Sequence, residues 1–286
     1  MRWTPGKISS NIEDKRGSSG GIGRAGMGLG TGAVLLVLSL VFGHNFFNDV
    51  APAGTDTSIS TNAAANAPPA SETPEEHQRV LFVSFVLDDV QSNWAKIFAN
   101  SGQQYHDAKL VLFRNAVQSG CGVAQSAMGP FYCPADQKVY IDLGFYDELT
   151  SRFGAPGDFA QAYVLAHELG HHIQHQLGTD ARVRQLEESR PGQSNNLSVR
   201  LELQADCFAG VWANTTEQRK LLNEGDITEA ITAASAVGDD RIQQEETGNI
   251  HPESFTHGTA AQRASWFKRG YTSGQPGSCD TFAGAI

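Results

Sequence analysis

The sequence predicts an α+β fold in which a small β-sheet is joined by a larger number of helices. Two short runs rich in β-branched and aromatic residues, "AKLVLFRNAV" and "KVYIDLGFY", are typical of strands. From Phe159 onward, apolar residues recur mostly at helical spacing. The predicted helices cover residues 158–177, roughly 195–223, 226–237, 239–246 and 258–270. Strands and helices that are segregated along a chain are typical of the α+β class.

The first helix of the folded part is predicted in the segment "RVLFVSFVLDDVQSNWAKIFANSG". Its large apolar residues, from Leu81 to Phe98, fall mostly at helical spacing, and Gly102 is a stop signal. The chain has 286 residues, of which 40% are hydrophobic, and this is enough for one ordinary core. We therefore predict a single folded domain over residues 79–286.

Residues 48–78 are predicted to be a flexible, disordered linker. They are poor in large apolar residues and rich in Ala, Pro, Ser, Thr and Asn. Such a composition cannot bury enough apolar surface to offset the entropy lost when a chain becomes ordered. The folded domain is therefore expected to stand at the end of a tether.

The uncharged apolar run from Met27 to Phe47 is long enough to cross a bilayer as one transmembrane helix. Residues 1–26 carry five Lys or Arg residues, whereas Asp49 follows the run. This asymmetry predicts a single-pass membrane protein with a cytoplasmic amino-terminal tail and a domain on the extracytoplasmic, periplasmic side. Two alternatives stay open. One is a signal peptide cleaved near "APA" at 51–53, and the other is a buried core helix, which the length of the run disfavours.

All four cysteines follow the apolar run, which fits an oxidising compartment in which disulfides persist. Of the three ways to pair them, we favour Cys121 with Cys133 and Cys207 with Cys279. The first pair closes a stretch that is typical of a loop, and such a clip stabilises a domain by roughly 2–4 kcal/mol. The alternative is four free buried thiols.

The formal net charge is −10, but it is unevenly spread, because residues 1–26 carry five Lys or Arg against Glu13 and Asp14. The rest of the chain is strongly acidic, so its surface repels polyanions. This distribution argues against nucleic acid as a partner.

The pattern H-E-x-x-H occurs once, as His167, Glu168 and His171. On a helix, residues four apart lie on one face, so the two imidazoles can converge on one zinc ion. Glu168 lies one step around the helix, where its carboxylate can reach a water on that ion. The pattern therefore predicts a zinc site with an adjacent general base and acid.

The other histidines of this helix are poor candidates for a third ligand. His175 lies about 12 Å from His167 along a helix axis, and His172 points about 100° away from His171. We interpret both as surface histidines or as neighbours of the ligands. The longer pattern H-E-x-x-H-x-x-G-x-x-H is excluded, because Gln174 and Leu177 occupy its last two positions.

The third ligand is predicted in "NLSVRLELQADCFAGVWAN", where Glu202 and Asp206 lie four residues apart. Their apolar neighbours would pack this helix into the core and turn its acidic side toward the first helix. Glu202 would complete a His₂Glu set, and Asp206 could accept the free N–H of a ligand histidine. The alternative is a solvated pair of carboxylates on an exposed helix.

These residues belong to a wider resemblance that runs nearly from end to end. The sequence resembles the membrane-anchored bacterial neutral zinc metallopeptidases of the YpfJ type in "RWTPGKISSNIEDKRG", "CGVAQSAMGPFYCPADQKVYIDLGFYDEL", "GAPGDFAQAYVLAHELGHHIQHQLG", "ELQADCFAGVWA" and "ESFTHGTAAQRASWFKRGY". The resemblance implies a zincin-like peptidase domain with His167, His171 and Glu202 on Zn²⁺. It also implies that Glu168 is the catalytic acid and base.

A tetrahedral oxyanion needs a hydrogen-bond donor besides the metal. His257 is the first candidate, together with Arg263 in the following helix, and Tyr163 or Tyr140 is the reserve. Since Gly258 follows, His257 could instead cap or pack at a helix start. For Asp142, a place at the cleft or beside a ligand histidine and a buried structural role are equally plausible. We expect the strand "KVYIDLGFY" to hold substrate by β-augmentation.

The sequence thus predicts a membrane-tethered zinc endopeptidase that acts on peptides or proteins. One alternative is a binding or scaffold module in which zinc is structural, although closed structural sites seldom keep a Glu beside the first His. Another alternative is a zinc hydrolase of a non-peptide amide, such as cell-wall material, since the same groups serve all amides.

Overall fold

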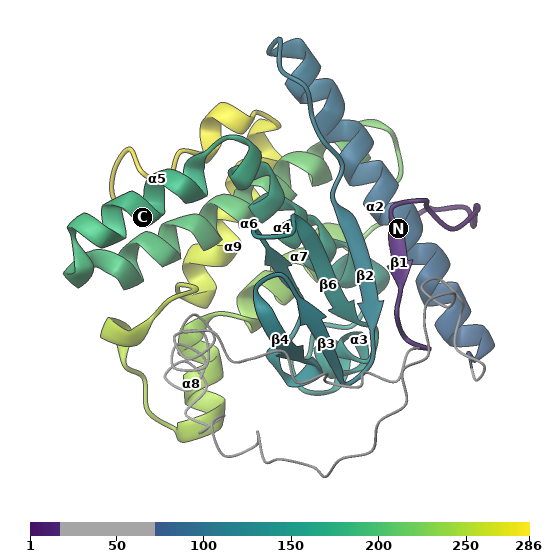
Figure 1. The fold of residues 1–286 in the computed structure, drawn as a ribbon, viewed down its shortest axis with the longest axis horizontal. Helices are drawn as coiled ribbons and strands as arrows, with labels where there is room; N and C mark the ends of the chain where they lie inside the picture. Colours follow the sequence, from purple (N-terminus) through teal and green to yellow (C-terminus); the bar gives the residue numbers. More distant parts are fainter. Residues whose placement is uncertain (18–71) are drawn as a thin grey trace, which may run out of the picture.

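The computed structural model describes residues 1–17 and 72–286, and within them the α+β prediction is confirmed (Figure 1). A four-stranded sheet and a two-stranded hairpin lie beside a helical majority. The predicted membrane segment 27–47 lies outside the described residues, as does most of the predicted linker 48–78. Among the residues described, the search for a long, apolar helix that could cross a membrane finds none.

The main sheet has the strand order β1 (Ile12–Asp14), β2 (Lys109–Phe113), β6 (Lys138–Asp142) and β5 (Phe131–Cys133). The first three strands are parallel, and β5 runs antiparallel to β6 at the edge. The expectation that "KVYIDLGFY" offers a free edge is therefore wrong. Because β2 pairs along the whole of β6 and β5 pairs with residues 138–140 on its other side, β6 is an inner strand of the sheet.

The uninterrupted apolar character of β2 follows from burial of both faces of the sheet. Leu110 and Leu112 pack into the main core with the helices, whereas Val111 and Phe113 belong to a smaller cluster on the other face. A strand with both faces covered has a continuous hydrophobic run rather than an alternating one. The continuous apolar run that predicted this strand is thus explained by its inner position in the sheet.

The smaller cluster is closed by the hairpin of β3 (Ala116–Ser119) and β4 (Gly122–Gln125), which leads into the 3-10 turn η1 (Ser126–Met128). A disulfide joins Cys121 at the hairpin tip to Cys133 at the end of β5. The second disulfide joins Cys207 to Cys279, so the predicted pairing is confirmed. Within the described chain the cysteines are all oxidised.

The long helix α2 (Pro74–Asn100) begins five residues before the predicted domain start at Arg79. Thr73 caps it, because its side chain accepts a hydrogen bond from the backbone N–H of Glu76. Pro74 occupies the first turn, where a missing N–H costs nothing. These capping residues lie inside the segment assigned to the linker by composition, and they mark the true start of the helix.

Five of the predicted helices are present within a few residues of their expected ends. They are α4 (Asp158–Gln176), α6 (Ser194–Gln218), α7 (Asp226–Ala236), α8 (Asp239–Thr247) and α9 (Ala260–Ser273). Two helices were not predicted, α3 (Phe145–Ser151) and α5 (Thr179–Ser189). The second is strongly polar and buries only Val183 fully, so it has no apolar stripe to detect.

Close packing of α4 on α6 depends on Gly170. A Cβ atom at this position would lie 3.0 Å from both the Cα and the carbonyl oxygen of Ala205, which is tighter than ordinary contacts. The absence of a side chain lets the two helix backbones touch. This contact brings the side chains that flank it on both helices within reach of one another.

Residues 1–17 lie in the same folded body as residues 72–286 (Figure 1). The strand β1 pairs with β2, and Trp3 packs edge-on against Phe82 of α2. Both the fold and its core therefore include residues from the segment predicted as a separate amino-terminal tail.

Candidate active site

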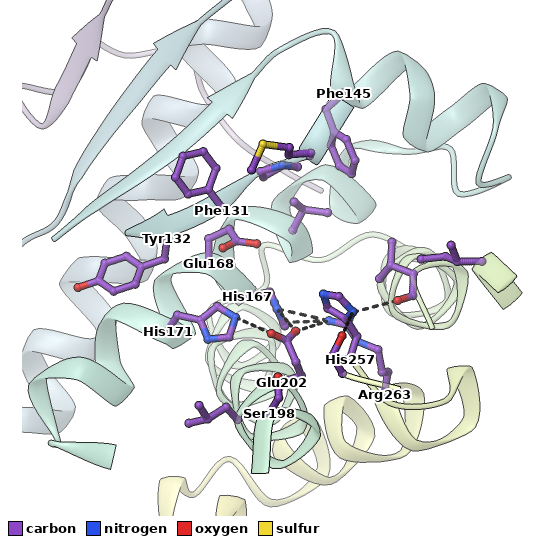
Figure 2. A pocket seen from close by; sticks show the side chains of 18 of the residues that line it. Phe131, Tyr132, Phe145, His167, Glu168, His171, Ser198, Glu202, His257 and Arg263 are labelled. Atoms are coloured by element: carbon purple, nitrogen blue, oxygen red, sulfur yellow. Dashed lines mark hydrogen bonds and ion pairs between the residues drawn. The ribbon is translucent and has the colours of Figure 1, made fainter. Parts of the chain in front are cut away.

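The helix α4 carries His167, Glu168 and His171 at the floor of a cleft, and α6 brings Glu202 against them (Figure 2). Nε2 of His167 lies 3.2 Å from one carboxylate oxygen of Glu202, and Nε2 of His171 lies 3.4 Å from the other. The predicted convergence of two imidazoles and one carboxylate from a second helix is therefore present in the fold.

This donor set fits a zinc ion. In a tetrahedral site with bonds of about 2.0–2.1 Å, neighbouring donor atoms are about 3.3 Å apart. The two separations between imidazole nitrogens and carboxylate oxygens match that value. Ligand atoms of all three side chains lie within 4.8 Å of one another. Two neutral imidazoles and one carboxylate are also a known set for catalytic zinc.

Each imidazole is held by its Nδ1–H, which leaves Nε2 directed at the shared point. His167 donates to Asp206 over 2.8 Å, and His171 donates to the side-chain oxygen of Gln174 over 2.9 Å. Gln174 is fixed in turn, because its amide donates to the backbone carbonyl of Leu201 on α6. Asp206 was predicted in this role. Gln174 was not, since the sequence drew attention to it only as the residue at the Gly position of the longer pattern.

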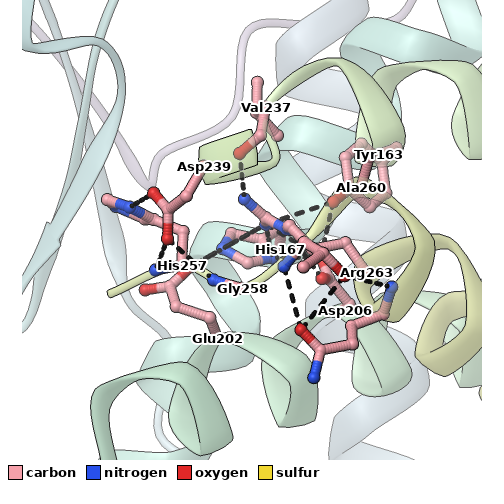
Figure 3. Close-up of polar contacts among 12 residues, drawn as sticks. Tyr163, His167, Glu202, Asp206, Val237, Asp239, His257, Gly258, Ala260 and Arg263 are labelled. Atoms are coloured by element: carbon pink, nitrogen blue, oxygen red, sulfur yellow. Dashed lines mark hydrogen bonds and ion pairs between the residues drawn. The ribbon is translucent and has the colours of Figure 1, made fainter. Parts of the chain in front are cut away.

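A buried charge cluster lies under His167 and joins three helices (Figure 3). Asp206 is fully buried, and Arg263 of α9 donates to its two oxygens over 2.9 and 3.0 Å. The hydroxyl of Tyr163 also donates to Asp206. Burial favours neutral forms, but Arg263 and His167 outweigh it and lower the pKa of Asp206. Asp206 is therefore a fixed anion that orients His167.

The same cluster governs the charge of the histidine above it. Burial disfavours the charged form of His167, but the neighbouring Asp206 carboxylate outweighs burial and raises the pKa of His167 to about 9. Burial likewise opposes ionisation of Glu202, whereas the imidazoles of His171 and His167 hold its pKa well below the usual value. Both shifts have one cause, since the carboxylates of Asp206 and Glu202 favour positive charge at the point where the imidazoles converge.

Glu168 has the environment of a proton carrier. Its side chain is 8% exposed, lines the cleft, and makes no hydrogen bond or ion pair with another described residue (Figure 2). Burial raises its pKa above the usual value for a glutamate, and the charges of His167 and His171 oppose this shift. A carboxylate with a raised pKa can take up a proton near neutral pH and release it again.

His257 lines the same cleft, and Asp239 holds it there. The Nδ1–H of His257 donates to Asp239 over 3.0 Å, while Asp239 also accepts backbone N–H groups of Thr256, His257 and Gly258 (Figure 3). Burial lowers the pKa of His257, but the bond to Asp239 and the charge of Glu202 raise it overall. Thr259, not His257, caps the helix α9.

The other residues named from the sequence have structural contacts. Tyr163 is buried against Asp206, and Arg263 is 3% exposed, so both support Asp206 beneath His167. Tyr140 is buried on the far face of the sheet, where its hydroxyl donates to Asp136. Asp142 accepts hydrogen bonds from the backbone N–H groups of Asn115 and Gly144 and from the hydroxyl of Ser126.

The two remaining histidines of α4 also have structural partners. His172 is fully buried, so the interpretation of it as a surface residue is wrong. Its Nε2–H donates to the carbonyl of His106, and its Nδ1 accepts from the hydroxyl of Tyr132 on β5. His175 pairs with Asp180 over 2.8 Å. His172 therefore ties the edge strand to the active-site helix.

The cleft has a volume of about 940 Å³ and two unlike sides (Figure 2). We name the first the helical wall, which carries His167, Glu168, His171, Glu202 and His257. The second is the sheet wall, which carries Met128, Phe131, Tyr132 and Phe145 from η1, β5 and α3. Charged groups thus face a mainly apolar surface across the space that a ligand would fill.

Comparison with known proteins places the chain in a family. Residues 1–282 match the family described as "Putative neutral zinc metallopeptidase". The chain is 46% identical to "Uncharacterized protein YpfJ" of Escherichia coli (strain K12), over the full length of both. It is 49% identical over 185 residues to "Uncharacterized protein Rv2575" of Mycobacterium tuberculosis (strain ATCC 25618 / H37Rv), covering 61% of this chain and 62% of the relative.

No solved structure matches the chain. The family match covers all the motifs on which the resemblance was based, from the amino-terminal segment to α9. This protein therefore belongs to the family of neutral zinc metallopeptidases of the YpfJ type, and Zn²⁺ is the cofactor that this membership implies.

Proposed function

We propose that this protein is a zinc metalloendopeptidase in which His167, His171 and Glu202 hold the ion and Glu168 is the general base and acid. The observation that carries the proposal is the separation of 3.2 and 3.4 Å between the Glu202 oxygens and the two imidazole nitrogens, beside an open cleft. Peptides or proteins are the proposed substrates, as the family description suggests.

Bound zinc supplies Lewis-acid chemistry, since it lowers the pKa of a water and polarises a carbonyl oxygen. Glu168 accepts the proton of the attacking water, because its side chain lines the cleft beside the proposed ligands and burial raises its pKa above the usual value. The same carboxylic acid then gives its proton to the leaving amine. Asp206 keeps His167 in one tautomer throughout, so the ligand nitrogen does not reorient between steps.

His257 is the proposed second donor to the oxyanion of the tetrahedral intermediate. Asp239 binds its Nδ1, which leaves Nε2 available on the cleft side (Figure 3). The raised pKa favours the protonated ring, and a charged donor stabilises a developing anion more than a neutral one does. Arg263 is not proposed as a donor, because its guanidinium is bound to Asp206.

The edge strand β5 is the proposed binding site for an extended substrate. Among the described residues it pairs with β6 alone, so its other edge can accept a strand of another chain. Phe131 and Tyr132 lie on this strand and line the cleft. A peptide added there would pass directly over Glu168.

The proposal is tested by comparing the full chain with its Glu168→Gln variant against a broad peptide library, with zinc content measured in both. We expect equal zinc content and a fall in kcat of about 10²–10⁴-fold or more, since the proton acceptor is lost. The matched control is Glu148→Gln, because Glu148 also lines the cleft and is not one of the proposed zinc ligands. Undiminished cleavage by Glu168→Gln would refute the assignment.

Two other results would point to the alternatives. A parent protein that binds zinc and cleaves no peptide, but hydrolyses cell-wall amides in a Glu168-dependent manner, would be a hydrolase of another amide. A parent protein that binds zinc and cleaves neither would be a non-catalytic module.

A further inference from the structure

We propose that residues 1–17 are an integral part of the folded domain and lie on the same side of any membrane as residues 72–286. This inference concerns a segment far from the zinc-binding residues and goes beyond the proposed function. It also differs from the topology predicted from sequence, in which residues 1–26 form a cytoplasmic tail and the domain is extracytoplasmic.

The first support is strand pairing. In β1, Ile12 lies opposite Leu110 and Asp14 lies opposite Leu112 of β2. The N–H of Leu110 donates to the carbonyl of Asn11, and the N–H of Lys15 donates to the carbonyl of Leu112, both over 2.8 Å. Without β1, the strand β2 would become an edge with its backbone groups unpaired beside a buried core.

The second support is the ion cluster around Arg16, whose side chain is 1% exposed. Its guanidinium lies 2.6 Å from Asp14, 2.9 Å from Glu72 and 2.9 Å from Glu76. Glu76 lies in the first turn of α2 and Glu72 lies just before the helix, so both follow residues 18–71 in the sequence. Removal of Arg16 would leave three partly buried acids without their shared cation, which is strongly unfavourable.

The third support is the contact between residues 3–9 and the body of α2. Trp3 packs edge-on against Phe82 with ring centroids 5.3 Å apart. The N–H of Ser9 donates to the hydroxyl of Ser84, and the hydroxyl of Ser9 donates to Asp88. Docking of the segment therefore combines apolar burial, backbone pairing and buried charge.

These contacts constrain topology because they cannot form across a bilayer whose apolar core is about 30 Å thick. One crossing by residues 27–47 would put residues 17 and 72 on opposite sides. A return would need a second run of about 20 apolar residues, and the sequence from 48 to 71 has none. Docking and a single crossing thus exclude one another. The two disulfides assign the shared compartment to the oxidising side.

Cysteine labelling of the full chain in intact spheroplasts tests the proposal. Lys7→Cys and Glu75→Cys introduce thiols at exposed positions in the two segments, and the four native cysteines are oxidised. We expect a membrane-impermeant maleimide to label both variants, at full chain length, before the cells are opened. Labelling of Glu75→Cys alone until permeabilisation would overturn the proposal, as would a mature chain that has lost residue 7.

Thermal unfolding of the purified full chain is the second measurement. We expect Arg16→Met to lower Tm by several degrees, whereas Lys7→Met, a change of an exposed basic residue in the same segment, leaves Tm unchanged. Equal Tm values for the two variants would mean that the segment is not docked, and the proposal would fail.

Discussion

The helical wall and the sheet wall of the cleft differ in the kind of residue that each carries. The helical wall holds five ionisable side chains, most of them fixed by hydrogen bonds to buried partners. The sheet wall is mainly apolar, and one edge of its strand β5 is unpaired within the described part of the chain. We infer that chemistry and substrate binding are divided between them. Substitutions on the helical wall should change zinc affinity or kcat, and those on the sheet wall should change KM.

The largest effect is expected from Glu202→Gln on the helical wall. An amide is a weaker zinc ligand than a carboxylate, and the two imidazoles alone leave the ion undercoordinated. We expect zinc affinity to fall by more than the roughly 10–100-fold that loss of a supporting residue costs, and cleavage to stop. Competition with a chelator measures the affinity. Glu253→Gln, at an exposed glutamate outside the cleft, is the control. Equal zinc affinities for the Glu202→Gln and Glu253→Gln variants would contradict the division of roles between the two walls.

The next effect is expected beneath the helical wall, at Asp206. Asp206→Asn removes the negative charge that holds His167 and leaves the buried Arg263 cation without its ionic partner. We expect zinc affinity to fall about 10–100-fold and the free energy of unfolding to fall by about 3–5 kcal/mol. Chelator competition and denaturant unfolding measure the two. A loss of stability with unchanged zinc affinity would show that Asp206 supports the fold alone.

A smaller effect, confined to turnover, is expected from the pair of His257 and Asp239. His257→Ala should lower kcat by about 10²-fold with little change in KM or zinc content. Because Asp239 raises the pKa of His257, the protonated donor is lost as pH rises through that pKa. Asp239→Asn should therefore move the alkaline fall in kcat/KM to lower pH. An unchanged pH profile in this variant would remove His257 from the mechanism.

The smallest effect is expected on the sheet wall. Phe131→Ala removes an aromatic ring from the cleft and should raise KM by about 5–30-fold, since lost apolar contacts of this size cost about 1–2 kcal/mol. Zinc content and kcat should stay near those of the parent. Ile250→Ala, at an exposed apolar residue outside the cleft, is the control. A large fall in kcat would show that the two walls do not divide the work as inferred.

The sequence predicts the parts of the site that follow from helical periodicity. His167 and His171, like Glu202 and Asp206, are four residues apart, so their shared faces could be derived without a structure. The approach of α4 and α6 at Gly170 was not predictable, because it depends on how two distant helices pack. Asp239 lies 18 residues before His257 in the sequence, and no local pattern links the two.

Strand order was the weakest part of the sequence-based prediction. The runs at β2 and β6 were found because both are buried on two faces. The strands β1 and β5 have three residues each, too few for a periodic signal. Their pairing decides which strand has a free edge and whether the amino-terminal segment joins the sheet. Both answers come from tertiary contacts that short strands do not encode locally.

The contact between Gly170 and Ala205 also links metal uptake to folding. Since the proposed ligands come from two helices that meet only in the packed domain, the unfolded chain has no comparable binding site for the ion. By mass action, free zinc at 100 times its Kd would add about 2.7 kcal/mol to the stability of the native state. Metal supply in the compartment where the chain folds would thus set the fraction of molecules that is folded at equilibrium.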